Sequence, residues 1–240
     1  MSLGSTDSLY HKRRRMITEP LILSIKLAAV VSALLFLIGV PLAGWLSITR
    51  LRWKFLIEAV VALPIVLPPT VLGYYILVSI SPDSILGSMY LDVFGSALPF
   101  SFEGLVFASI LYSLPFAVQP FLASFESVDP RLSEAAWTLG ASRLKTFLTI
   151  VIPSSVQGLI TGGVLSFAHT LGEFGVVLLV GGNIPGSTRV VSISIYDNVQ
   201  ALEYEQAGQT ALTLLVFSFL VLSVVYATNR RVWAIWPKHF

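Results

Sequence analysis

The chain contains no cysteine and few charged residues for its length. Asp, Glu, Lys and Arg make up 12% of its 240 residues, and hydrophobic residues make up 55%. Because soluble domains carry about 25% charged residues, we expect lipid rather than water to surround much of this protein. The absence of cysteine excludes disulfides and thiolate metal sites. The formal net charge of +2 gives no reason to expect a nucleic-acid partner.

The sequence also lacks the phosphate-binding pattern GxxxxGK[ST]. This loop holds the phosphates of ATP in many ATP-hydrolysing proteins. We therefore expect that the chain is not an enzyme, binds no cofactor, and depends on another subunit for any use of ATP.

Five long apolar stretches predict an all-α polytopic membrane protein. A helix needs about 20 apolar residues to cross a bilayer core about 30 Å thick, and a helix satisfies its backbone polar groups internally. We expect one membrane domain over residues 16–229, followed by a tail over residues 230–240. The predicted spans are residues 21–49, 55–81, 104–125, 156–180 and 207–228.

Positive charge predicts how these spans are oriented. Lys and Arg gather on the cytoplasmic side of membrane proteins, and the loops on the other face contain only Arg189. We therefore expect the C-terminus in the cytoplasm and the N-terminus on the opposite side of the membrane. The residues on the cytoplasmic face are Arg50, Arg52, Lys54, Arg131, Arg143, Lys145, Arg230, Arg231 and Lys238.

A basic segment near the N-terminus disagrees with this orientation. His11–Arg15 would lie outside the cell, where a cluster of basic residues is unusual. We interpret residues 1–15 as a disordered or non-native extension, with the true start at Met16. The alternative is a basic amphipathic stretch on the inner membrane surface.

A charged insert over residues 129–153 interrupts the apolar sequence. Asp129 and Pro130 predict the start of a helix, and Gly140 predicts its end in a left-handed conformation. Ser142 then predicts the cap of a second short helix. These helices are too polar to cross a bilayer, so we expect them to project into the cytoplasm. The simpler interpretation is an amphipathic connector at the membrane surface.

The spacing inside the insert resembles the EAA loop of the membrane subunits of bacterial ABC importers. Glu134-Ala135-Ala136 precedes Gly140, which lies six residues after the glutamate, and Ile150, which lies sixteen after it. Ile152-Pro153 follows, where the family pattern has Leu-Pro. In that family the loop is the coupling helix, which docks in a groove of the ATP-hydrolysing subunit. The resemblance implies an ATPase-coupling surface made of Glu134, Ala135, Ala136, Gly140, Ala141 and Ser142.

Two further stretches resemble molybdate permease subunits. "LPIVLPPTVLGY" (residues 63–74) matches the LPxVLPP and GY of that family, and "LGEFGVVLLVGGNIPGSTR" (residues 171–189) matches its GEFG, NIPG and TR. Sulfate permeases share GEFG but are usually longer and have six spans. The resemblance covers residues 16–229 and implies import of molybdate, with tungstate as a near-isostere. Import of sulfate or thiosulfate is the alternative.

Polar groups and bent backbone in these stretches are candidates for a translocation pathway. Prolines bend the second span, and four polar residues recur at helical spacing in the fourth. A charged group at membrane depth normally faces a cavity or a partner. Glu173 could bond to His169, satisfy backbone loosened at Gly172 and Gly175, or touch the substrate. The candidates are Pro68, Pro69, Thr70, Gly73, Ser166, His169, Thr170 and Glu173.

The resemblance also implies an assembly. It comprises a homodimer with a pore on its two-fold axis, two ATP-binding cassette subunits that hold ATP and Mg²⁺, and a periplasmic binding protein that delivers the oxyanion. The spans contain no Arg and only Lys26 at a margin, which predicts a weak, transient passage. A secondary transporter or channel is the alternative of another class. Such carriers usually show inverted repeats, and the sequence shows only one kinked span without a matching partner.

Overall fold

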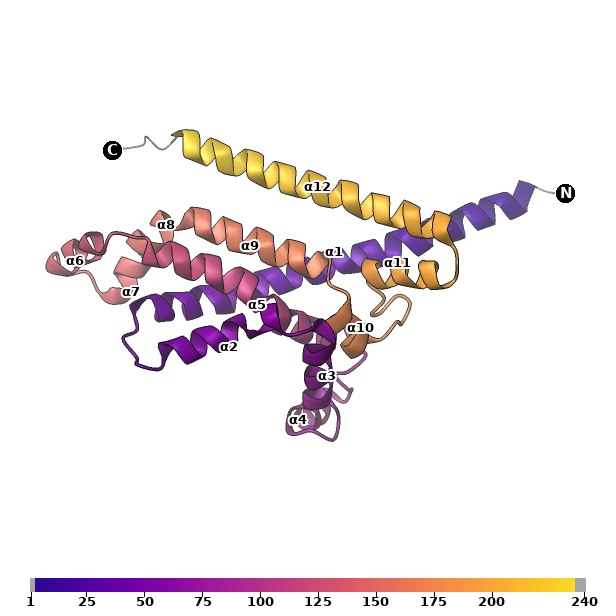
Figure 1. The fold of residues 1–240 in the computed structure, drawn as a ribbon, viewed down its shortest axis with the longest axis horizontal. Coiled ribbons are helices and arrows are strands. Elements are labelled where there is room, and N and C mark those ends of the chain that lie inside the picture. Colours follow the sequence, from indigo (N-terminus) through magenta and orange to yellow (C-terminus); the bar gives the residue numbers. More distant parts are fainter. Residues whose placement is uncertain (1–2, 236–240) are drawn as a thin grey trace. The chain divides into compact units, whose positions relative to one another are not determined.

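A computed structural model describes the backbone of residues 3–235 and the side chains of residues 18–224, 226 and 227. These residues form helices and connecting loops, with no strand in the described range (Figure 1). The elements are α1 (Leu3–Ile48), α2 (Lys54–Val66), α3 (Pro69–Ile80), α4 (Ile85–Phe94), α5 (Phe102–Glu126), α6 (Pro130–Thr138), α7 (Arg143–Thr146), the π-helix η1 (Phe147–Val151), α8 (Ile152–Ser154), α9 (Val156–Leu171), α10 (Gly175–Gly181), α11 (Val191–Gln200) and α12 (Tyr204–Ile235).

Among the residues that the structure describes, three helices are long and apolar enough to cross a membrane: Thr18–Ile48 within α1, α5, and Tyr204–Val224 within α12. The number rises to five if each of two bent pairs of helices is counted as one span. The first pair is α2 with α3, which break where Pro68 and Pro69 occur. Proline has no backbone N–H and disfavours the helical conformation in the residue before it. Two consecutive prolines therefore explain this break, where Leu67 and Pro68 have extended ψ angles of 137° and 136°.

The second bent pair differs from the predicted fourth span. One span over residues 156–180 was predicted, with a loosened backbone at Gly172 and Gly175 as one interpretation, and in the structure α9 ends at Leu171 and α10 has only 7 residues. Instead, Arg143–Ser154 precedes α9 with a bend of 73°. Gly172 lies at the end of α9, and glycine costs about 1 kcal/mol in a helix interior relative to alanine. This part of the apolar sequence therefore does not continue as one helix.

The chain divides into two compact units. Unit 1 comprises Met1–Val30, Pro68–Ser109 and Thr170–Phe240, and unit 2 comprises Val31–Leu67 and Ile110–His169. Helices α1, α5 and α9 each belong partly to both units, and the single membrane domain over residues 16–229 stays a prediction.

In unit 1, α3 packs directly on α10 through glycines. Gly73 is so close to α10 that an ideal β-carbon on it would lie 3.2 Å from the Cα atom of Val176. Gly175 approaches Pro69 in the same way, with 2.8 Å from an ideal β-carbon to the Cβ atom of Pro69. Small residues allow helix axes to approach closely. These glycines therefore bring together residues 63–74 and 171–189, the two stretches that resemble molybdate permease subunits.

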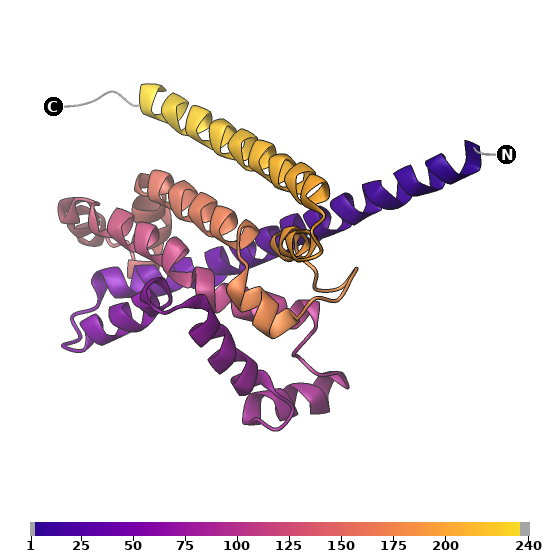
Figure 2. The ribbon, with the colours of Figure 1, turned by 45° about the vertical axis from the view of Figure 1, so that its right-hand side comes forward.

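In unit 2, α5 and α9 lie side by side (Figures 1 and 2). Gly162 of α9 faces Phe121 of α5, which is fully buried. The ring of Phe36 on α1 lies 5.2 Å from the ring of Phe121, measured between centroids. Large side chains from α1 and α5 thus fill the space that the glycines of α9 leave open.

Two helices, α4 and α11, lie in segments that were expected to be loops. Ser84 caps α4 by accepting a hydrogen bond from the backbone N–H of Gly87 (2.9 Å), and Gly95 ends it with φ of 70°. Both signals are local and readable from the sequence. Helix α11 begins where the N–H of Val191 donates to the Ser24 hydroxyl (2.8 Å), a tertiary contact that no local pattern predicts.

The backbone of α1 is helical from Leu3 onward, whereas residues 1–15 were expected to be a disordered or non-native extension. Residues 1 and 2, and the side chains up to residue 17, lie outside the described residues. Whether this segment belongs to the native chain stays a prediction. So does the cytoplasmic tail over residues 230–240, of which residues 230–235 continue α12 and residues 236–240 lie outside the described residues.

Candidate coupling and translocation sites

The insert has the local structure that its sequence predicts. The Asp129 carboxylate accepts a hydrogen bond from the N–H of Arg131 (2.9 Å) at the start of α6, and Pro130 is the first helical residue. Gly140 has φ of 83°, in the left-handed region. Ser142 accepts a hydrogen bond from the N–H of Lys145 (3.2 Å) and so caps α7. Two short helices meeting at a glycine corner are thereby confirmed.

The surface of the insert is exposed and partly apolar. No residue of α6 is buried, and Leu139 is 88% exposed. The rings and chains of Trp137 and Leu144 are also exposed, and the Arg143 guanidinium lies 5.9 Å from the Trp137 ring centroid. Apolar side chains gathered on a polar surface mark an interaction site. Helical spacing predicts Leu144 on an apolar side of the second helix, but it does not single out Trp137 and Leu139 as surface residues, because exposed and core apolar residues look alike in the sequence.

Most of the predicted coupling residues are also exposed. Glu134, Ala135, Gly140 and Ser142 are exposed, whereas Ala136 and Ala141 are half-buried. The structure therefore leaves most of the predicted surface free of contacts within the chain. Its role in coupling stays a prediction.

The pathway candidates at the start of α3 fall into two groups. Pro68, Pro69 and Thr70 are exposed, and Thr70 adds a hydroxyl to this surface. Gly73 is buried against α10. It contributes close packing, so it does not line an open surface in this structure.

The candidates of α9 lie mainly inside the protein. Ser166 is fully buried and donates a hydrogen bond to the backbone carbonyl of Gly163 (3.0 Å), and Thr170 is 3% exposed. His169 is half-buried: its ring stacks on Phe116 with a centroid distance of 3.9 Å, and its Nδ1 atom is 2.9 Å from the Ser113 hydroxyl. In this structure these residues pack helices together, and their place in a pathway stays a prediction.

Glu173 does not lie on the face of α9, because that helix ends two residues earlier. It sits in the break before α10 and is 4% exposed. Its backbone N–H donates to the carbonyl of Thr170 (3.3 Å), and its own carbonyl accepts from the Ser192 hydroxyl (2.5 Å). The carboxylate lies beside the Ser109 hydroxyl, but neither oxygen makes a hydrogen bond of normal geometry with any described residue. The bond to His169 that the sequence allowed is therefore not formed.

Arg189, the only basic residue in the loops expected outside, is tied to carboxylate and amide groups. Its Nε atom donates to the Asn183 side-chain oxygen (2.5 Å), and a terminal nitrogen lies 3.5 Å from Asp197. The Asn183 amide also donates to Asp197. Because Asp197 balances its charge, Arg189 is a poor free site for an oxyanion.

Reactivity of introduced cysteines distinguishes the exposed candidates from the buried ones. The chain has no cysteine, so each substitution adds a single thiol. We expect Thr70→Cys to react with a small water-soluble thiol reagent when the site faces water, and Ser166→Cys to stay inert because its side chain is buried. Labelling of the assembled complex, followed by mass spectrometry, measures both. Rapid labelling of Ser166→Cys in the resting complex would show that α9 lines an open pathway after all.

Comparison with known proteins agrees with this fold. Residues 22–234 match the family model described as "Binding-protein-dependent transport system inner membrane component". The chain is 50% identical over 208 residues to the molybdenum transport system permease protein ModB of Azotobacter vinelandii, which covers 87% of this chain and 92% of that protein. It is 34% identical over 231 residues to a probable sulfate transport system permease protein, cysT of Zygnema circumcarinatum, covering 93% of this chain and 79% of that protein.

Among solved structures, the MetNI methionine ABC transporter in an inward-facing conformation matches with a TM-score of 0.71 at 14% identity. The match covers 97% of this chain and 99% of that chain, and at this identity it supports the fold alone. Together with the family model, which spans nearly the whole chain, these matches place the helices described above in one known architecture. The chain belongs to the family of inner membrane components of binding-protein-dependent transport systems.

Proposed function

We propose that the chain is the membrane-spanning permease subunit of an ATP-driven importer of molybdate. The observation that carries this proposal is the high identity to a molybdenum permease along almost the full length of both chains. The identity to a sulfate permease is lower, which favours molybdate, with tungstate as a near-isostere, over sulfate.

The chain does not hydrolyse ATP, so it depends on partner subunits. Its sequence has no phosphate-binding loop, and ATP with Mg²⁺ binds to two ATP-binding cassette subunits. These dock on the insert, whose exposed apolar residues Leu139 and Trp137 need a partner surface to cover them. Two copies of the chain form the pore on a two-fold axis, which is the commonest symmetry of oligomers.

Import begins outside the cell, where a periplasmic binding protein delivers the oxyanion. A tight site for a dianion needs cations or converging N–H donors. The predicted spans contain no Arg, and Arg189 is balanced by Asp197. The permease therefore offers a weak passage through which the anion moves without being held, and selectivity resides in the binding protein.

Stimulation of ATP hydrolysis tests this function. The complex of this chain, its ATPase subunits and the binding protein is reconstituted in lipid, and hydrolysis is measured with the binding protein loaded with molybdate, tungstate, sulfate or thiosulfate. We expect molybdate and tungstate to stimulate hydrolysis above the rate with unloaded binding protein. Equal or greater stimulation by sulfate would favour a sulfate importer. Import without ATP would favour a secondary transporter or channel.

A further inference from the structure

Three consecutive residues at the end of α5 each hold a different segment of unit 2. Ser124 contacts the joint between α8 and α9, Phe125 contacts η1, and Glu126 contacts α2. The insert leaves α5 only three residues later, at Asp129. The insert therefore connects to the spans at two points, the end of α5 and the joint at Ser155. We call the first of these points the first foot of the insert and the second point its second foot.

Two reciprocal hydrogen bonds join these feet. The Ser124 hydroxyl donates to the backbone carbonyl of Ser155, and the Ser155 hydroxyl donates to the carbonyl of Ser124, each at 3.2 Å. Ser155 is fully buried, and Gly158 allows the approach, since an ideal β-carbon there would lie 2.5 Å from the Ser124 hydroxyl. The chain bends by 73° at Ser155, which leaves backbone groups free for these bonds.

An aromatic contact joins the first foot to η1 and to α1. The rings of Phe125 and Phe147 lie edge to face with a centroid distance of 5.3 Å, and Phe125 is 4% exposed. Phe147 also lies against Gly44 of α1, where an ideal β-carbon would be 2.6 Å from the tip of the ring. A π-helix is less regular than an α-helix and is often found at functional sites. This one is held from two sides.

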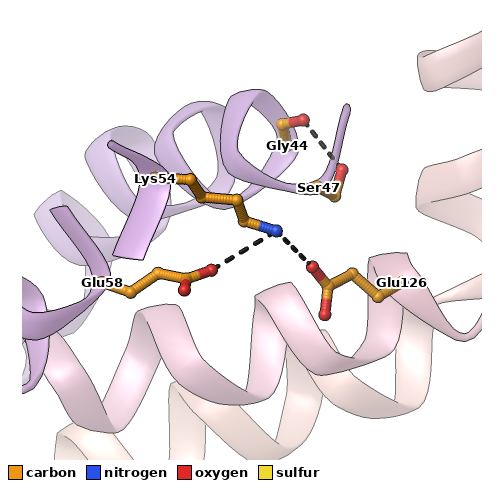
Figure 3. A network of polar contacts seen from close by, with 5 residues as sticks. All are labelled: Gly44, Ser47, Lys54, Glu58 and Glu126. Carbon is orange, nitrogen blue, oxygen red and sulfur yellow. Dashed lines mark hydrogen bonds and ion pairs between the residues drawn. The ribbon is translucent and has the colours of Figure 1, made fainter. Parts of the chain in front are cut away.

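An ion pair joins the first foot to α2 (Figure 3). The Lys54 ammonium lies 2.8 Å from the Glu126 carboxylate and 3.4 Å from that of Glu58. Lys54 and Glu58 both belong to α2, so only the bond to Glu126 connects separate helices. Exposed ion pairs contribute little on their own, and Glu126 is 45% exposed. We therefore assign this pair a smaller effect than the buried serine pair.

From these contacts we infer that Ser124, Phe125 and Glu126 are positioning residues that lock the two feet of the insert together. The inference rests on the proposed function, because it concerns how a push on α6 reaches the spans. Without the lock, a displacement of α6 would bend the chain at Ser155 or in η1 and would not reach the spans. With it, the insert and the adjoining ends of α1, α2, α5 and α9 move as one body.

A covalent link between the feet gives the sharpest test. Ser124→Cys and Ser155→Cys are combined in this chain, which has no other thiol, and the variant is assembled into the full complex. We expect oxidation to consume both thiols and to leave most of the uptake measured before oxidation, since the feet do not separate during transport. Thiols that stay reactive under oxidant would contradict the inference. So would a loss of uptake that a reductant restores.

Removing the lock should uncouple ATP hydrolysis from transport. For Ser124→Ala with Ser155→Ala we expect the ratio of ATP hydrolysed to anion imported to rise at least roughly fivefold, because two hydrogen bonds are lost and each contributes about 1 kcal/mol net, the equivalent of about fivefold. Thr161→Ala is the matched control, because that hydroxyl bonds only to the carbonyl of Gln157 in its own helix. An unchanged ratio in the double variant would overturn the inference.

The ion pair provides a second comparison in the same assay. Glu126→Gln should raise the ratio more than Glu58→Gln, because only Glu126 ties α2 to another helix. Equal ratios for the two variants would show that Glu126 does not contribute to the lock. Uptake by the unsubstituted complex tests the proposed function in each experiment, and the comparison of variants tests the lock whichever anion is imported.

Discussion

Gly140→Val is expected to leave the amount of protein in the membrane unchanged and to abolish most of the coupled import. Gly140 has φ of 83°, and an ideal β-carbon on it would have no atom within 4 Å. The cost is therefore backbone strain, of about 1–2 kcal/mol for a residue with a β-carbon, rather than a clash within the chain. Relief of that strain changes the angle between α6 and α7. Retention of the ATPase subunits and anion-stimulated hydrolysis measure the effect.

Two control substitutions separate the role of the corner from strain in general. Gly140→Asn should behave nearly as the unsubstituted chain, because asparagine tolerates the left-handed conformation. Gly95→Val places the same residue at φ of 70°, also with open space around it, at the end of α4. We expect Gly95→Val to keep ATPase retention and coupling. If Gly140→Val keeps full coupled uptake, the insert is only a connector.

Gly162→Val is expected to remove most of the folded protein. An ideal β-carbon at this buried position would lie 2.5 Å from the Phe121 ring and 2.8 Å from the backbone carbonyl oxygen of Ala117. Helices α5 and α9 would have to separate, and overpacking of this kind costs roughly 1–3 kcal/mol or more. The yield of monodisperse protein and its melting temperature in detergent measure the loss.

Gly208→Val is the matched control for this substitution. Gly208 lies in α12 and is exposed, and an ideal β-carbon on it would meet no atom within 4 Å. We expect its yield and melting temperature to equal those of the unsubstituted chain. If Gly162→Val is as stable as Gly208→Val, the contact between α5 and α9 is looser than described here.

The sequence predicted the insert well because its structure is determined locally. Asp129, Gly140 and Ser142 act on backbone groups within three residues of themselves. The fold class followed from composition, since a chain with so little charge and such long apolar stretches has few alternatives to a helical membrane protein. These features need no knowledge of which helices meet.

The breaks and the pathway candidates could not be predicted in the same way. Apolar periodicity predicted one span over residues 156–180 and placed Glu173 on the face of His169, and it left a loosened backbone at Gly172 and Gly175 only as an alternative. The chain instead breaks before Gly175, which packs on Pro69, more than a hundred positions earlier. Likewise Ser166 is polar and Gly73 is flexible, so both are reasonable pathway candidates in the sequence. Neighbouring helices bury them in the structure, and the sequence does not show which helices these are. A single sequence does not show which distant segments make such contacts.

The lock between the feet of the insert shows the same limit. Ser124 and Ser155 are ordinary serines in the sequence, and their reciprocal bonds appear only once α5 and α9 lie side by side. Lys54 is one of several basic residues that predict the orientation of the spans, whereas no pattern in the sequence points to its partner Glu126. The signal that a sequence does carry is indirect: Gly158 and Gly162, spaced by one helical turn, indicate that another helix comes close.

Simultaneous measurement of molybdate uptake and ATP hydrolysis tests the central claim most directly. Liposomes contain the complex of this chain with its ATPase subunits, and the binding protein is supplied outside with radiolabelled molybdate. The proposed function predicts that uptake requires both ATP and the binding protein, and that Gly140→Val stops uptake while the spans remain inserted. Uptake that continues without ATP, or that is unchanged in Gly140→Val, would contradict an importer driven through this insert.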